Sequence, residues 1–171
     1  MRISSRLFAI LLIVCVVCGG FLTACSFSEP KAPGGTPSGS GNTGASGSNG
    51  KGKKAEVLAI AKKYIGTPYR YGGQDPRGFD CSGYVLYVFR QAGVTLPHSA
   101  ADQFAKLSSV KTPEPGDLVF FHTFGTGVSH VGIYAGGNTF LHSPTTGKFV
   151  EYADMRIDYW QKAYRGARTV F

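Results

Sequence analysis

The chain has 171 residues, 43% of them hydrophobic, and a formal net charge of +8, which suits one ordinary domain with a sizeable core and additional segments. It carries no Lys/Arg stripe and no recognised nucleic-acid-binding motif, so we exclude nucleic acid as a partner. The basic balance suits an anionic partner, such as a phospholipid headgroup or a polymer that bears carboxylates, and it equally suits a solvated surface without a partner.

The first 24 residues predict a lipoprotein signal peptide. Arg2 and Arg6 precede an apolar run at residues 7–17, which is shorter than the roughly 20 residues of a transmembrane helix. The segment ends in LTAC at residues 22–25, which resembles a bacterial lipobox and implies lipidation of Cys25 after cleavage. The alternative is an ordinary signal peptide that contains a cysteine.

A flexible linker is expected between the lipid anchor and a folded domain. Residues 26–54 are dominated by Gly, Ser, Pro, Thr and Asn, a composition that does not form a packed core. We therefore expect a signal peptide at 1–24, lipidated Cys25 with its linker at 25–54, and a folded domain at 55–171. An anchor in the cell envelope follows, and Ser26 after the lipidated residue favours the periplasmic side of the outer membrane in a two-membrane bacterium.

Helical patterns fill the first part of the domain. Apolar spacing predicts a helix over residues 55–66 and a second over 82–92, with Cys81 in its first turn. Ser99 lies three residues before Asp102, which indicates the capped start of a third, short helix.

After Pro113 the pattern changes to strands. The segments DLVFFH, VSHVGIYAG, NTFLHSP, FVEYA and ARTVF are β-branched or aromatic and are separated by turn residues, as strands require. GGN at 136–138 predicts a hairpin turn. Helices followed by a meander of strands indicate an α+β fold, with N-terminal helices packed on an antiparallel sheet of about five to six strands.

Cys81 is the one cysteine that remains once the signal peptide and Cys25 are set aside. A single thiol cannot form an internal disulfide, so it is either buried or reactive. A position at a helix start favours the thiolate, which indicates a nucleophile. The alternative is a small core residue.

A nucleophilic thiol requires a nearby base, and two histidines on neighbouring predicted strands are candidates for it. A hairpin that reverses near Gly136 would pair His130 directly with His142, with Cβ atoms about 4.5–5.5 Å apart. We expect His130 to act as the base and His142 to orient it. The same pair and Cys81 are three potential zinc ligands, but the chain has no H-E-x-x-H motif, and we expect no metal requirement.

Three other side chains are assigned less closely. His98 is expected in the capping region of the third helix, with the cleft as the alternative. His122 is expected at the surface or behind the site. Trp160 is expected either in the core or on the cleft.

The motifs PYRYGG, GFDCSGYV, PGDLVFF, SHVGIY and FLHS resemble the NlpC family of bacterial cell-wall cysteine endopeptidases, in that family's order and over residues 55–171. The resemblance is to the short lipoprotein form related to murein endopeptidases. It implies a papain-like core, with Cys81 as nucleophile, His130 as general base and His142 as the third polar residue.

The resemblance also implies roles around the thiol. Tyr71 matches a tyrosine whose hydroxyl helps a backbone amide to hold the oxyanion. Asp80 and Ser82 match residues that, in relatives, contact the amine of the peptide or shape the pocket.

The implied substrate is the stem peptide of peptidoglycan. The bond cut is either γ-D-glutamyl–diamino acid or the D-alanine–diaminopimelate crosslink. We expect a monomer without a cofactor. The alternative function is a non-catalytic envelope lipoprotein that holds peptidoglycan in the same cleft.

Overall fold

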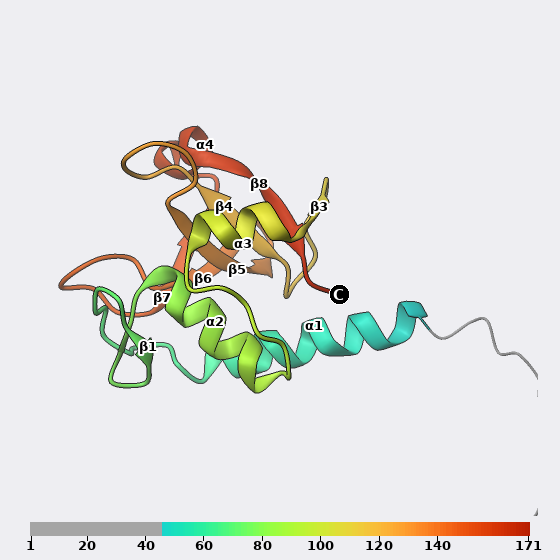
Figure 1. Ribbon diagram of the computed structural model, residues 1–171. Helices are drawn as coiled ribbons and strands as arrows, with labels where there is room; N and C mark the ends of the chain where they lie inside the picture. Colours follow the sequence, from blue (N-terminus) through green and yellow to red (C-terminus); the bar gives the residue numbers. More distant parts are fainter. Residues whose placement is uncertain (1–45) are drawn as a thin grey trace, which may run out of the picture. The chain divides into compact units, whose positions relative to one another are not determined.

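The computed structural model describes residues 46–171 of the chain (Figure 1). The expected signal peptide, Cys25 and most of the expected linker lie outside these residues. Between residues 46 and 171, no helix combines the length and the apolar character needed to cross a membrane.

Three helices precede most of the sheet: α1 (Ser46–Lys62), α2 (Cys81–Gln91) and α3 (Ala100–Lys106). Local sequence sets the start of the last two. The Asp80 carboxylate caps α2 by accepting a hydrogen bond from the backbone N–H of Gly83, and the Ser99 hydroxyl caps α3 by accepting one from Asp102. The predicted capped start of the third helix is therefore confirmed.

The start of α1 differs from the expectation. The helix begins at Ser46 rather than near Ala55, so the last part of the expected linker is helical. Lys54 supplies a physical reason, because its ammonium group lies 2.9 Å from the Glu114 carboxylate and 3.0 Å from that of Asp117. Such tertiary contacts override the low helix propensity of a Gly- and Ser-rich segment.

Six strands form an antiparallel sheet in the order β3-β8-β4-β5-β6-β7. The strands are β3 (Ser108–Val110), β4 (Leu118–Phe121), β5 (His130–Gly136), β6 (Thr139–His142), β7 (Glu151–Asp154) and β8 (Tyr164–Thr169). A two-stranded ribbon of β1 (Gln74–Asp75) and β2 (Gly78–Phe79) precedes α2. The predicted α+β class and strand number are confirmed, whereas β3 and the short helix α4 (Asp158–Ala163) were not predicted.

The sheet separates two apolar cores. On one face, Leu118 and Phe120 of β4 join the apolar residues of α1, α2 and α3. On the other face, Val119 and Phe121 of the same strand pack with Ala163 of α4. This alternation follows from the two-residue period of a strand. Helices therefore lie on both sides of the sheet, and the larger helical layer carries Cys81 (Figure 1).

The turn between β5 and β6 is shifted from the predicted position. Gly136 pairs with Thr139, which leaves Gly137 and Asn138 as the two turn residues. Both have positive φ, 60° and 62°, as a type I′ turn requires. The turn is therefore centred beyond Gly136, and a bulge between Tyr134 and Gly136 shifts the register back by one residue.

As a result, the predicted direct pairing of His130 with His142 is wrong. Ile133 lies opposite Leu141, and continuing this register places His142 opposite Gly132. His130 is then the diagonal neighbour of His142. The shift is an even number of residues along the strand, so both histidines still project from the same face of the sheet.

Candidate active site

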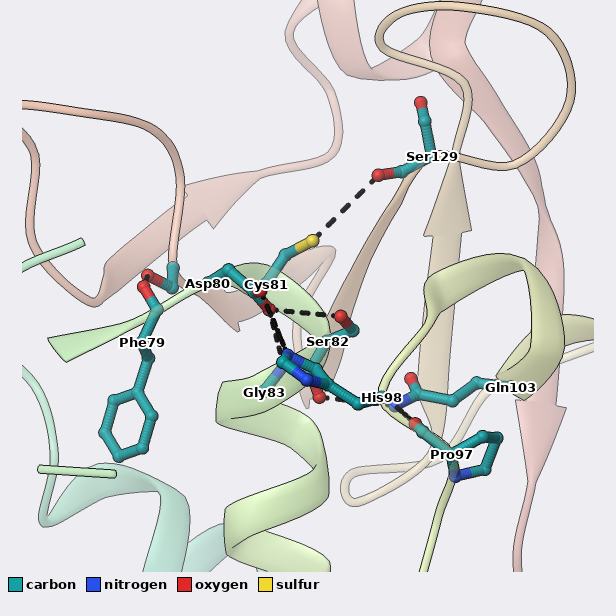
Figure 2. Close-up of polar contacts among 10 residues, drawn as sticks. Phe79, Asp80, Cys81, Ser82, Gly83, Pro97, His98, Gln103 and Ser129 are labelled. Atoms are coloured by element: carbon teal, nitrogen blue, oxygen red, sulfur yellow. Dashed lines mark hydrogen bonds and ion pairs between the residues drawn. The ribbon is translucent and has the colours of Figure 1, made fainter. Parts of the chain in front are cut away.

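The first residue of α2 places its thiol beside the start of β5. The Sγ atom of Cys81 donates a hydrogen bond to the backbone carbonyl of Ser129 over 3.9 Å (Figure 2). Burial, followed by the nearby Asp80 carboxylate, raises the pKa of Cys81 to about 11. Hydrogen bonds from the backbone N–H groups of Val131, Ser82 and Cys81 itself act in the opposite direction but do not outweigh burial. The resting group is therefore a protonated thiol.

A buried histidine pair lies at the ends of β5 and β6. His130 is 4% exposed and His142 is 2% exposed. The Nε2 atom of His130 lies 2.8 Å from Nδ1 of His142, and the two rings are nearly perpendicular at 87°. Because Nε2 of His130 is occupied in this way, its Nδ1 is the ring nitrogen left to exchange a proton with another group.

Both imidazoles are neutral at pH 7. Burial lowers the pKa of His130 to about 4 and that of His142 to about 3. For Nδ1 of His130 to act as a base, its Nε2 must carry the hydrogen and donate it to Nδ1 of His142. Within residues 49–171 the Cys81 thiol makes no hydrogen bond to the His130 ring, and both groups line the same cleft. Such contacts often tighten only when substrate binds.

Trp160 of α4 covers the histidine pair. Its ring centroid lies 5.5 Å from that of His130 and 5.2 Å from that of His142, and it also packs on Phe121 and Phe140. The same side chain lines the cleft. The two alternatives left open by the sequence, core and cleft, therefore both describe it, and its packing helps to keep the imidazoles out of water.

The cleft has a volume of about 900 Å³. Its walls are mainly aromatic, hydroxyl-bearing and small residues. Aromatic side chains reach it from several elements: Tyr69, Tyr71, Phe124, Tyr159 and Trp160. His98 also lines it, whereas His122 is outside the lining and contacts the Gly127 carbonyl within the loop after β4. Asp80 is the one carboxylate in the lining, which includes no lysine or arginine.

Asp80 and Ser82 bind to each other and to neighbouring groups of the protein (Figure 2). The Asp80 carboxylate accepts hydrogen bonds from the Gly83 backbone N–H at 2.7 Å and from the Ser82 hydroxyl at 3.0 Å. Its second oxygen lies 3.0 Å from Nε2 of His98. The carboxylate is thus already partnered, and Ser82 is buried beneath it.

The two tyrosines of the PYRYGG motif differ in their surroundings. Tyr71, the predicted oxyanion residue, is 90% exposed, and its hydroxyl makes no hydrogen bond in the described part of the chain. Tyr69 is half-buried and forms a bridge to Phe79, two residues before Cys81. Burial raises the pKa of Tyr69, and the charges of Cys81 and Asp80 raise it further. Tyr69 was not predicted from the sequence. Its position directly after Pro68, at the start of an extended segment, could have indicated that it lies close to the chain before Cys81.

A comparison with known families decides the classification. The NlpC/P60 family profile matches residues 66–169. The chain belongs to this family. The predicted resemblance is confirmed, and the match falls inside the domain expected at residues 55–171.

Curated relatives of the chain include proteins named as peptidoglycan or murein endopeptidases. The chain is 38% identical to the probable peptidoglycan endopeptidase LytE of Bacillus subtilis and 41% identical to the murein DD-endopeptidase MepH of Escherichia coli, over 67% and 69% of its own length. It is 46% identical to a gamma-DL-glutamyl hydrolase of Bacillus subtilis over 66% of its length. It spans only 34%, 47% and 28% of these three relatives.

Solved structures of NlpC/P60 proteins have the same fold. A lipoprotein-like member from Staphylococcus aureus superposes with a TM-score of 0.64 at 38% identity, covering 70% of this chain and 42% of that one. The NlpC/P60 domain of the peptidoglycan hydrolase SagA superposes with a TM-score of 0.60 at 36% identity, covering 68% of this chain and 98% of that domain. Both are consistent with the predicted papain-like α+β core.

Proposed function

We propose that this NlpC/P60 protein is a peptidoglycan endopeptidase in which Cys81 is the nucleophile, His130 the general base and His142 the residue that orients it. One observation carries the proposal: a thiol at a helix start and a buried, hydrogen-bonded histidine pair meet at one cleft. Family membership and relatives named as peptidoglycan or murein endopeptidases support it.

The proposed mechanism starts from neutral groups. Because the pKa of Cys81 is raised and that of His130 is lowered, the proton remains on sulfur until a substrate carbonyl lies against it. As Sγ attacks the carbonyl carbon, the thiol proton passes to Nδ1 of His130, and the imidazolium is stabilised through its bond to His142. The imidazolium then protonates the leaving amine, and water hydrolyses the thioester.

Stabilisation of the oxyanion is assigned to groups around the first turn of α2. The backbone N–H of Cys81 is one donor at a helix start, where several amide groups are free. For the second donor, the surroundings of Tyr69 favour its hydroxyl over that of the exposed Tyr71. Asp80 and Ser82 shape this wall of the cleft.

The substrate is proposed to be a stem peptide or crosslink of peptidoglycan. The curated relatives carry names for two different bonds, a γ-glutamyl bond and a DD-crosslink, so both remain candidates. The cleft lining has no lysine or arginine, so we expect recognition through aromatic rings, hydroxyls and backbone groups rather than through a fixed cationic side chain.

The proposed location is the cell envelope. The lipobox-like LTAC motif suggests a lipid on Cys25 and a tether that ends where α1 begins, and Ser26 favours the outer membrane in a two-membrane bacterium. Metabolic labelling with a palmitate analogue tests this point. We expect label in the wild-type protein and none in the Cys25→Ala variant. Equal labelling of both proteins would show that Cys25 is not the site of lipidation.

Digestion of purified, crosslinked sacculi tests the activity. The protein without its signal peptide is compared with Cys81→Ala, and released muropeptides are identified by mass spectrometry. Fragments from the wild type alone are expected, and their masses name the bond. If both proteins bind sacculi and neither releases fragments, the chain is a binding protein. If both release the same fragments, Cys81 is not the nucleophile.

A further inference from the structure

The negative charge of the Asp80 carboxylate disfavours the thiolate form of the neighbouring Cys81. After burial, its charge is the next cause that raises the pKa of Cys81, and it also favours the protonated form of His130. The cleft lining contains no lysine or arginine to offset it. The titratable groups that line the cleft are Asp80 at the N-cap of α2, Cys81 of α2, His98, His130 of β5, and Tyr69, Tyr71 and Tyr159.

The imidazole of His98 contacts the Asp80 carboxylate directly. Its Nε2 atom lies 3.0 Å and 3.2 Å from the two carboxylate oxygens of Asp80 (Figure 2). Within residues 49–171, it is the one basic side chain within ion-pair distance of Asp80. Because an ionised carboxylate can only accept hydrogen bonds, Nε2 of His98 must carry the hydrogen.

A buried amide holds His98 in this place. Gln103 of α3 is fully buried, and its side-chain nitrogen donates to the carbonyl of Pro97 at 2.8 Å and to that of Ser82 at 3.3 Å (Figure 2). Both partners are acceptors, so the chemistry fixes the orientation of the amide. Gln103 therefore joins the residue before His98 to the residue after Cys81.

The first turn of α2 is also shaped for close approach of the ring. A Cβ atom on Gly83 would lie 2.9 Å from Nε2 of His98 and would overlap the Gly73 carbonyl oxygen. Only glycine leaves the space in which the imidazole reaches the carboxylate. The contact between His98 and Asp80 is thus supported from two elements, α2 and α3.

We propose that His98 is a positioning residue for the nucleophile, which holds the Asp80 carboxylate through the hydrogen bond from Nε2 and so weakens its effect on the Cys81 thiolate. The proposal rests on the role of Cys81 proposed above. It assigns His98 no contact with substrate. Its effect passes through Asp80, so it should disappear when the carboxylate is removed.

A double-mutant cycle on thiolate formation tests this inference. The full-length chain in detergent is treated with uncharged iodoacetamide at several pH values, and alkylation of Cys81 is followed by mass spectrometry of the tryptic peptide of residues 78–90. Only the thiolate reacts. The variants are His98→Ala, His98→Arg, Asp80→Asn and the double variant His98→Ala with Asp80→Asn. Asparagine remains a good helix cap, and circular dichroism checks each fold.

We expect His98→Ala to slow alkylation at pH 7.5 by about 3- to 10-fold, which corresponds to a rise of up to about one unit in the thiol pKa. His98→Arg should retain the wild-type rate, and Asp80→Asn should react faster. In the Asp80→Asn background, His98→Ala should change the rate by less than about twofold, because no charge is left to offset.

A loss of equal size in both backgrounds would show a merely structural role for His98 and overturn the proposal, as would an unchanged rate in His98→Ala. Alkylation needs no peptidoglycan. If the cycle behaves as expected in a protein that releases no muropeptides, the proposed function fails while this inference stands.

Discussion

His130 and His142 are diagonal rather than opposite neighbours in the β5–β6 hairpin, and their rings still meet at 2.8 Å between Nε2 and Nδ1. The diagonal distance between strands is within reach of aromatic side chains. The residue that lies opposite His142 in this register is Gly132, and the Phe140 ring fills the space above it. The histidine pair therefore depends on the local register as well as on the two side chains.

Two replacements of His142 test whether this residue acts by orienting the His130 imidazole. We expect His142→Ala to lower the rate of muropeptide release by about 100- to 1,000-fold, within the range for general acid–base catalysis. His142→Asn should retain at least about tenfold more activity than the alanine variant, because its amide oxygen can accept the hydrogen bond from Nε2 of His130. Initial rates on sacculi give the comparison, and equal loss in two folded variants would contradict the assigned role.

Gly132→Ala should destabilise the protein. The added Cβ would overlap the Phe140 ring and lie 2.8 Å from the Leu141 carbonyl oxygen, and overpacking of this kind costs about 1–3 kcal/mol. Gly52→Ala in α1 is the matched control, because no atom lies within 4 Å of the added carbon. We expect that control to gain about 0.5–1 kcal/mol from helix propensity. Urea unfolding measures both, and a neutral Gly132→Ala would refute the packing argument.

Stability should fall as the pH decreases below 6.5. His130 and His142 have pKa values lowered by burial to about 4 and about 3, from an ordinary value of 6.5. Above pH 6.5 they are neutral in both states, so this stability is fully present. As the pH falls toward 4, the unfolded chain takes up protons that the folded chain does not.

The dependence of the free energy of unfolding on pH shows whether His130 and His142 cause this decline. Each histidine that protonates only on unfolding lowers the free energy of unfolding by about 1.4 kcal/mol per pH unit. Urea unfolding between pH 7.5 and 4.5 should show this decline in the wild type and a smaller one in a His130→Gln, His142→Gln double variant. The same decline in both proteins would assign it to other groups.

Lys54, in the middle of α1, should stabilise the protein more than its neighbour Lys53 does. It reaches the buried carboxylate of Asp117, so Lys54→Ala leaves that charge with poorer compensation and is expected to cost about 1–3 kcal/mol. Lys53 forms an exposed pair with Glu56, and Lys53→Ala should cost no more than about 0.5 kcal/mol. Thermal unfolding of both variants checks the difference, and equal shifts would argue against a special role for Lys54.

Local signals in the sequence predicted much of the candidate site. Asp80 before Cys81 is a capping pattern, so the start of α2 and the place of the thiol could be predicted from neighbouring residues alone. The two histidines share one face of the sheet as predicted, because the bulge before the turn makes the net shift in register an even number of residues.

Contacts that are distant in the chain could not be predicted. The position of the β5–β6 turn moves His130 from opposite to diagonal, and the bulge beside the turn keeps both histidines on one face of the sheet. The partner of Asp80 is His98, which is brought there by a loop and by Gln103 on another helix. The choice between Tyr69 and Tyr71 depends on a bridge to Phe79. The periodicity of a single segment contains none of this information.

The proposed catalytic groups lie on opposite faces of the sheet, each with a different apolar core. The sulfur of Cys81 belongs to the helices that pack on one face, whereas His130 and His142 project from the other face with Trp160. A partly unfolded state with the sheet intact and the helices undocked would keep both imidazoles and remove the sulfur from them. Such a state has no nucleophile beside its base, so it is inactive even though its histidine pair is intact. On heating, activity should accordingly be lost before the sheet melts.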